Sequence, residues 1–162
     1  MNFRWIISSV FVLLLWSCNE NVIYDKNLPI EKELWSYDAP KIFTVDINDT
    51  LSTYNIFIQL RHSFHFEWRN LWVKVETVYP DGKKLTERVN LLLCEPDGKW
   101  FGSCLNDQCF IKIPLQENAY FPKKGTYTFS ISQDMRQNPL PKVRFIGLRI
   151  EKSAAKPSRV KR

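Results

Sequence analysis

Apolar and polar side chains alternate with a period of two along most of this chain. Such a period places every second side chain on one face of a strand, so each stretch predicts a β-strand with one buried face. These stretches lie at residues 54–61, 71–77, 84–93, 110–114, 127–131 and 146–150. A further strand is predicted at residues 42–47, where either of two sets faces inward: Ile42, Thr44 and Asp46, or Phe43, Val45 and Ile47.

Turn-forming residues separate the alternating stretches. Pro80-Asp81-Gly82 and Pro96-Asp97-Gly98 both combine residue types that favour tight turns. Pro114 indicates that its strand ends there or lies at a sheet edge. No stretch keeps apolar side chains at helical spacing over three turns. Seven or eight strands joined in this way predict an all-β domain over residues 27–151, an antiparallel β-sandwich of jelly-roll-like type.

The chain begins with a short apolar segment that follows one basic residue. Arg4 precedes an apolar run over residues 5–16, which only two serines interrupt. As a helix this run would extend about 18 Å, which is shorter than the roughly 30 Å hydrocarbon core of a bilayer. The segment therefore favours a signal peptide over a membrane-spanning helix.

The end of this segment, Leu15-Trp16-Ser17-Cys18, resembles a bacterial lipoprotein signal. The resemblance implies that residues 1–17 are a removable signal peptide and that Cys18 carries a diacylglyceryl group with a further acyl chain such as palmitate. Two or more acyl chains give stable membrane anchoring. We therefore expect residues 18–26 to form a lipidated tether. The domain would face the periplasm, anchored by lipid to an envelope membrane that the sequence does not specify.

Charge is concentrated at the C-terminal end. The chain has a formal net charge of +6, and residues 151–162 contain five basic side chains against one acidic one. We predict a disordered basic tail over residues 152–162, because Val160 is its one large apolar residue. The tail either keeps the protein soluble or contacts anionic groups. The domain itself is nearly neutral, so we expect no nucleic-acid partner.

Three cysteines follow Cys18, and an odd number in an oxidising compartment suggests one disulfide and one buried thiol. Cys104 and Cys109 flank the turn-forming pair Asn106-Asp107, so we predict that they form the disulfide. Cys94 ends an apolar run and is expected in the core.

Motifs for catalysis and metal binding are missing from the sequence. It has no G-x-S-x-G, phosphate-binding loop or H-E-x-x-H motif. His62 and His65 are the two histidines, and with the cysteines they do not give the spacing of a zinc site. We expect no metal, cofactor or small-molecule substrate and no enzymatic activity, with His62 a polar group at the mouth of the sandwich. A Ser/His/Asp site that draws on these histidines is a disfavoured alternative.

Tryptophans suggest another class of function. Trp72 lies opposite the apolar face of its strand, so it could form a stacking platform in a carbohydrate-binding sandwich that recognises an envelope polysaccharide. Alternatively, Trp72 and Trp100 cover the edges of the core. Separately, Asp49-Thr50-Leu51 resembles an acceptor signal for O-glycosylation, which we treat as a hypothesis.

A set of spaced sequence words is more specific. The words are YNIFIQLRH at 54–62, NL at 70–71, PDG at 80–82, GKWFG at 98–102, FPKKGTYTF at 121–129, QDMR at 133–136, NPL at 138–140 and FIGLRI at 145–150. Together with the lipoprotein start, they resemble the gliding-motility-associated lipoprotein family GldH. The patterns Y-N-x-x-x-x-x-R and Q-x-M-R are the most informative, because sandwich packing does not demand polar residues there.

This resemblance implies a non-enzymatic envelope lipoprotein that binds or scaffolds components of the gliding machinery or of its linked protein-secretion apparatus. It supplies no catalytic residue. The loop with Asp134, Met135 and Arg136 separates two apolar strands, and loops at a sandwich end commonly bind partners. We therefore take these three residues and Trp72 as partner-binding candidates. The alternative is that Asp134 and Arg136 pair with each other or with backbone to hold the crossover.

Overall fold

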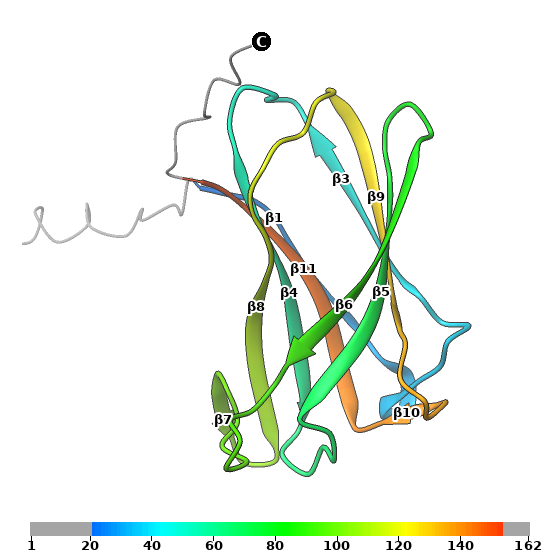
Figure 1. Ribbon diagram of the computed structural model, residues 1–162, viewed down its shortest axis with the longest axis vertical. Helices are drawn as coiled ribbons and strands as arrows, with labels where there is room; N and C mark the ends of the chain where they lie inside the picture. Colours follow the sequence, from blue (N-terminus) through cyan, green and yellow to red (C-terminus); the bar gives the residue numbers. More distant parts are fainter. Residues whose placement is uncertain (1–20, 154–162) are drawn as a thin grey trace, which may run out of the picture.

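The computed structural model describes residues 21–153, which form an antiparallel β-sandwich (Figure 1). Its elements are β1 (Val22–Pro29), a 3-10 turn (Glu31–Glu33), β2 (Leu34–Trp35), β3 (Lys41–Ile47), β4 (Tyr54–Ser63), β5 (Asn70–Val78), β6 (Lys84–Leu92), β7 (Ser103–Leu105), β8 (Gln108–Ala119), β9 (Gly125–Gln133), β10 (Leu140–Pro141) and β11 (Val143–Lys152). The larger sheet has the order β1-β11-β4-β8-β7, and the smaller has β3-β9-β5-β6. β10 pairs with β2 in a short ribbon. The predicted all-β sandwich is confirmed.

The core lies between the facing sides of the two sheets. In β3, Phe43, Val45 and Ile47 are buried, which decides between the two alternatives that the sequence leaves open. In the neighbouring β9, Tyr127, Phe129 and Ile131 are buried in the same alternating way. Burial of these apolar faces is the main favourable term in folding.

The folded domain begins earlier than the sequence suggests. Residues 22–26, expected in the tether, belong to β1, which pairs with β11 from Val22 to Pro29. β1 is an edge strand with mostly exposed side chains, so its sequence alternates weakly and backbone hydrogen bonds define it. Lys152, expected in the tail, ends β11, and its Nζ lies 3.0 Å from a carboxylate oxygen of Asp49. Cys18, the signal peptide expected at residues 1–17 and residues 154–162 lie outside the described residues.

β8 is longer than the strand expected at 110–114. Pro114 pairs with Phe57, and the register of β4 and β8 shifts between Ile56 and Phe57. β7 pairs with β8 only at residues 108–110, so at Pro114 one side of β8 is a free sheet edge. An irregular edge position tolerates proline because no ladder hydrogen bond requires its missing N–H.

The loops gather at the two ends of the sandwich. The upper end in Figure 1 has the loops at 48–53, 79–83 and 120–124. The start of β1 and the end of β11 lie toward this end, where the N–H of Ser153 donates to the carbonyl of Thr53. The opposite end, called the distal end below, has the loops at 64–69, 93–102 and 134–139. No helix within residues 21–153 has the length and apolar character needed to span a membrane.

Candidate partner-binding groove

Four residues singled out in the sequence share one groove at the distal end. Trp72 comes from β5, and Asp134, Met135 and Arg136 come from the segment after β9. The groove has a volume of about 460 Å³. Its lining is completed by Trp68, Arg88 and Gln137. The fold therefore brings together a strand residue and a loop that are about sixty positions apart in sequence.

Gln133 holds the loop from inside the protein. Its side chain is buried, and its Nε2 lies 3.2–3.3 Å from the carbonyl oxygens of Trp35 and Gln137 and from Oδ1 of Asn138. Its Oε1 accepts a hydrogen bond of 2.8 Å from the backbone N–H of Met135. A buried amide with several partners fixes the backbone around it. The residues that follow are therefore presented in a defined conformation.

The loop also continues the pairing of β9 with β5 beyond Gln133. The backbone N–H of Asp134 donates to the carbonyl of Trp72 at 2.8 Å, and the N–H of Trp72 faces the sulfur of Met135 at 3.3 Å. The hydroxyl of Tyr37 donates to the carbonyl of Met135. Met135 is thereby fixed against Trp72, and both side chains remain half-buried at the groove.

Asp134 has a structural partner that the sequence analysis missed. Its carboxylate forms an ion pair with Arg88 on β6, and the guanidinium of Arg88 lies 4.2 Å from the centroid of the Trp72 ring. Asp134 therefore does not pair with Arg136. The Pro80-Asp81-Gly82 turn sets the register of β5 and β6, which places Asn90 opposite Trp72 and Arg88 diagonally from Trp72. This register could have predicted the contact between Arg88 and Trp72.

Arg136 is the exposed cation of the groove. It makes no hydrogen bond or ion pair with any other residue between 21 and 153. Arg88 and Asp134 neutralise each other, so Arg136 leaves the groove with an unbalanced positive charge. An exposed arginine beside a Trp and a Met is a typical arrangement for contact with another protein.

Trp72 is less suited to sugar stacking than its position in the sequence suggests. Arg88 covers one face of its ring. Among the other tryptophans, Trp35 is fully buried, and its Nε1 donates to the carbonyl of Ala39 at 3.1 Å. Trp68 and Trp100 are partly buried against the core, so the described part of the chain has no open row of indole rings.

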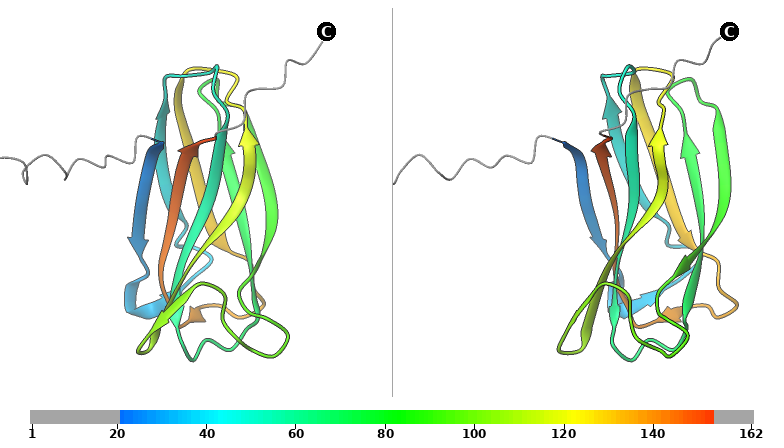
Figure 2. Two further views of the ribbon diagram at one scale, coloured as in Figure 1. Left: turned by 90° about the vertical axis from the view of Figure 1, so that its left-hand side faces the viewer. Right: turned by 60° about the vertical axis from the view of Figure 1, so that its left-hand side comes forward.

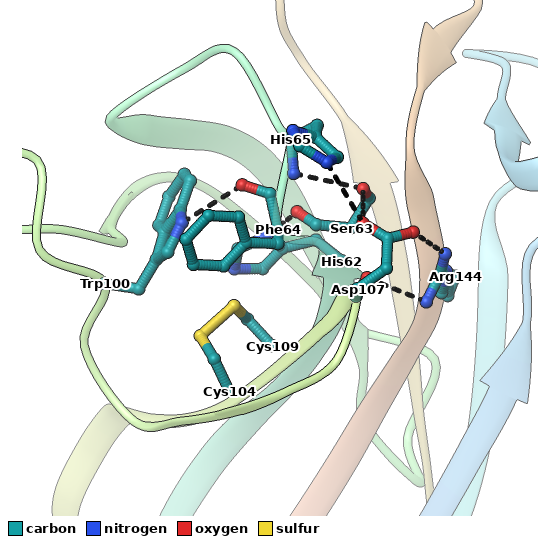
Figure 3. The surroundings of a disulfide bond; sticks show 9 residues. All are labelled: His62, Ser63, Phe64, His65, Trp100, Cys104, Asp107, Cys109 and Arg144. Atoms are coloured by element: carbon teal, nitrogen blue, oxygen red, sulfur yellow. Dashed lines mark hydrogen bonds and ion pairs between the residues drawn. A yellow bond between two sulfur atoms is a disulfide. The ribbon is translucent and has the colours of Figure 1, made fainter.

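A second polar cluster lies at the distal end, around a disulfide between Cys104 and Cys109 (Figure 3). The two cysteines are cross-strand partners on β7 and β8, with Cα atoms 4.0 Å apart. Asp107 in the intervening turn accepts a hydrogen bond of 2.8 Å from Ser63 Oγ and pairs with Arg144 at 2.6 Å. The hydrogen bond from Ser63 has the largest effect on the pKa of Asp107, and together with Arg144 it holds this pKa below its usual value. Cys94 is a buried free cysteine.

His62 does not lie at the mouth of the sandwich as expected; it is fully buried. Its ring contacts Phe66 and Trp100, with centroids 5.3 and 4.6 Å away. Its Nδ1 lies 2.9 Å from the carbonyl oxygen of Ser63, while the Ser63 hydroxyl donates to Asp107 instead (Figure 3). The serine hydroxyl and the buried imidazole therefore do not form a nucleophile–base pair.

Metal-binding geometry is not found in the described part of the chain. No group of three or more His, Cys, Asp or Glu side chains within residues 21–153 is arranged to hold a metal ion. At Asp49-Thr50-Leu51, the Asp49 carboxylate accepts hydrogen bonds from the N–H of Leu51 and from the hydroxyl of Ser52, which lower its pKa. These contacts do not test O-glycosylation of Thr50, which stays a prediction.

Comparison with known proteins identifies the family. A family model described as GldH lipoprotein matches residues 22–150. The chain belongs to the GldH lipoprotein family. The matched span begins with β1 and ends in β11, so it covers the sandwich except for the last two residues of β11. The resemblance drawn from the sequence words is therefore confirmed.

Two relatives support this membership. One from Christiangramia forsetii, named gliding motility lipoprotein GldH homolog, is 30% identical over 152 residues, covering 89% of this chain and 93% of the relative. One from Flavobacterium johnsoniae, named gliding motility lipoprotein GldH, is 26% identical over 146 residues, covering 86% of this chain and 90% of the relative. In both cases the similarity extends over nearly the full length.

Proposed function

We propose that this chain is a non-enzymatic, lipid-anchored envelope protein that binds a protein component of the gliding-motility machinery or of the secretion apparatus linked to it. The names of the two relatives support the motility role. The observation that carries the binding role is the groove in which Trp72, Met135 and the unpaired Arg136 meet.

The position of the groove suits a membrane-anchored protein. Lipidation at Cys18 would attach the bilayer four residues before Val22, and fully extended chain spans at most about 14 Å over that distance. The upper end, toward which the start of β1 lies, would therefore stay near the membrane. The distal end, with the groove, would point away from it and face a partner in the periplasm.

The chemistry of the groove indicates a protein partner with an acidic side chain beside an apolar one. The carboxylate would pair with Arg136, and the apolar side chain would pack against Met135 and the edge of Trp72. Charge pairs at an interface edge steer association, while buried aromatic contacts give most of the binding energy. Sugar binding through Trp72 has less support, because Arg88 already covers one face of its ring.

Cross-linking in the native host tests this proposal. A tagged chain is cross-linked in intact cells, purified from detergent-extracted membranes and analysed by mass spectrometry. We expect motility or secretion components to co-purify, and their recovery to fall at least tenfold with Arg136→Glu and with Trp72→Ala. Lys124→Glu and Tyr120→Ala are matched controls, since both residues are exposed at the opposite end. Unchanged recovery with both groove variants, at wild-type protein levels, would refute the role of the groove.

A second experiment tests the anchor. In fractionated cells, Cys18→Ser should shift the protein from the membrane fraction to the soluble envelope fraction. In intact cells, the wild-type domain should resist an added protease and become sensitive after the outer membrane is permeabilised. Membrane retention of Cys18→Ser, or cleavage in intact cells, would contradict the lipid anchor or the periplasmic orientation, respectively.

A further inference from the structure

The outer face of the larger sheet contains a second recess, separate from the groove. Figure 2 shows this face, with β1, β11, β4 and β8 side by side. The recess has a volume of about 370 Å³. It is lined by Asp25, Asn27, Gln59, Arg61, Phe110, Lys112 and Arg149. These residues occupy neighbouring cross-strand positions, so the sheet register fixes their relative placement.

Gly147 lies on this outer face and has no side chain. It lies between Asn27 on β1 and Gln59 on β4 in the cross-strand register. A Cβ atom at position 147 would lie 2.2 Å from Oδ1 of Asn27 and 2.9 Å from the carbonyl oxygen of Lys26. The Asn27 side chain therefore lies directly over the glycine. Only glycine leaves room for the Asn27 side chain at this position.

Arg61 lies at the side of the recess, and no carboxylate of the described chain pairs with it. Its guanidinium carbon lies 5.7 Å from the ring centroid of Phe110 and 5.2 Å from that of Phe145. Its guanidinium makes no ion pair or hydrogen bond with another residue of the described chain, and its buried Nε has no partner. Two aromatic rings thus orient a planar fork that matches the geometry of a carboxylate.

Gln59 is a second unsatisfied group in the recess. Its side chain is 4% exposed, and its buried Oε1 has no hydrogen-bond donor. A buried acceptor without a donor is unfavourable, because it has lost the hydrogen bonds that water makes to it in the unfolded chain. Gln59 and Arg61 are two residues apart on β4, so they point to the same face. One lacks a donor and the other lacks an acceptor, which is the pattern that a ligand with both groups would satisfy.

The charges around the recess favour an anion. Arg149 pairs with Asp25 and Glu151, and Lys112 pairs with Glu151 at 3.4 Å. These contacts balance the neighbouring carboxylates and leave the charge of Arg61 uncompensated. Lys112 also lies 4.4 Å from the ring centroid of Phe57, which keeps its ammonium over the sheet.

We propose that this recess binds a carboxylate-bearing sugar unit of an acidic polysaccharide. The carboxylate of the sugar would accept hydrogen bonds from the guanidinium of Arg61. One sugar hydroxyl would donate to Oε1 of Gln59, and a second hydroxyl would contact the side-chain amide of Asn27 over Gly147. A peptide fits less well beside Gln59 and Arg61, because β4 and β11 are central strands whose backbone groups are already paired, so these strands cannot hold a peptide by strand addition.

Calorimetric titration of the full chain in detergent tests this site at about 0.15 M salt, where nonspecific charge attraction is screened. The probes are a galacturonic acid trimer and its methyl ester, in which each charged carboxylate is replaced by a neutral methyl ester of slightly larger size. We expect binding of the acid, at least tenfold weaker binding of the ester, and at least tenfold weaker acid binding by Arg61→Gln. Arg69→Gln changes an exposed arginine in the 64–69 loop, which lines neither the recess nor the groove, and should bind the acid like the wild type.

A second measurement keeps the proposal testable if Arg61→Gln fails to fold. In NMR titrations of the wild type, the acid trimer should shift the side-chain amide signals of Gln59 and Asn27 and leave the loop at 134–139 unchanged. No binding, equal binding of the ester, shifts confined to the distal loop, or preference for a glutamate trimer or inorganic phosphate would each overturn the proposal. The recess and the groove lie on different sheets, so either proposal can fail without the other.

Discussion

His62 combines full burial with a titratable side chain. Burial is the main cause that lowers its pKa, and the nearby charge of Arg144 adds to the effect, while the hydrogen bond with the Ser63 carbonyl opposes it. The unfolded chain, with an ordinary histidine pKa of about 6.5, therefore binds more protons than the folded chain in mild acid. The contribution of His62 to stability is complete above that pH and is lost as the pH falls toward the lowered folded-state pKa.

Urea denaturation between pH 5 and 7.5 should show this effect. We expect the free energy of unfolding to fall below about pH 6.5 by at most about 1.4 kcal/mol per pH unit. His62→Gln should be less stable at pH 7.5 but should lose this pH dependence. His65→Gln changes an exposed histidine and should retain it. A wild-type slope that persists in His62→Gln would show that another group causes it.

Four carboxylates also have lowered pKa values, so their contribution to stability is lost at lower pH than that of His62. They are Asp49, Asp81, Asp107 and Glu151.

At the level of elements, β1 shows how a strand can form with little sequence signal. It is held to β11 by backbone pairing, and Asn27 fits against the bare backbone of Gly147. The exposed edge position requires no alternation of apolar residues. The contact with Gly147 is therefore a specific packing feature of the β1–β11 pair.

Gly147→Ala tests this packing. The added methyl group meets the Asn27 side chain and the rigid carbonyl of Lys26, so we expect a loss of about 1–3 kcal/mol in the free energy of unfolding, measured by denaturation. Adding Asn27→Ala should recover only part of this loss, because the backbone clash remains. Full recovery would mean that β1 shifts freely, and no loss in the single variant would refute the close approach. Hydrogen exchange of β1 amides should increase in Gly147→Ala.

Strands with strong alternation could be predicted because one of their faces is buried in the core, and this includes β3 at a sheet edge. β1, β2, β7 and β10 could not, because β1 is mostly exposed and the other three contain only two or three residues, so they depend on pairing partners. For the groove, local polarity was enough to select Trp72, Asp134, Met135 and Arg136. The roles of Gln133 and Arg88 depend on contacts across long sequence separations, and the burial of His62 results from the packing of Phe66 and Trp100 around it.

At the scale of the whole molecule, the two ends of the sandwich have different surroundings. β4 contains ten residues, so the strands hold the ends roughly 30 Å apart. With a lipid on Cys18, the short chain before β1 keeps the upper end close to the bilayer. The distance of the groove from the membrane is then set by strand length rather than by a flexible linker.

A longer tether should therefore impair function without affecting the fold. We insert twelve Gly/Ser residues between Asn19 and Glu20 and compare denaturation and co-purification of partner proteins with the wild type. Stability should be unchanged, and recovery of cross-linked partners should fall severalfold, because the groove is no longer held at one height. The same insertion after Lys156, at the other end of the chain, is the control. Full partner recovery with the long tether would show that the height of the groove does not matter.

With a lipid on Cys18, the short connection to β1 would also affect how strongly the groove must bind its proposed partner. A domain held this close to its bilayer searches for partners in a thin layer along the membrane rather than through the whole compartment. A partner anchored in the same membrane shares that layer, which raises the local concentration of each protein for the other. A groove of about 460 Å³ with one free arginine can then form a lasting assembly through a contact that would be weak between the same proteins in solution.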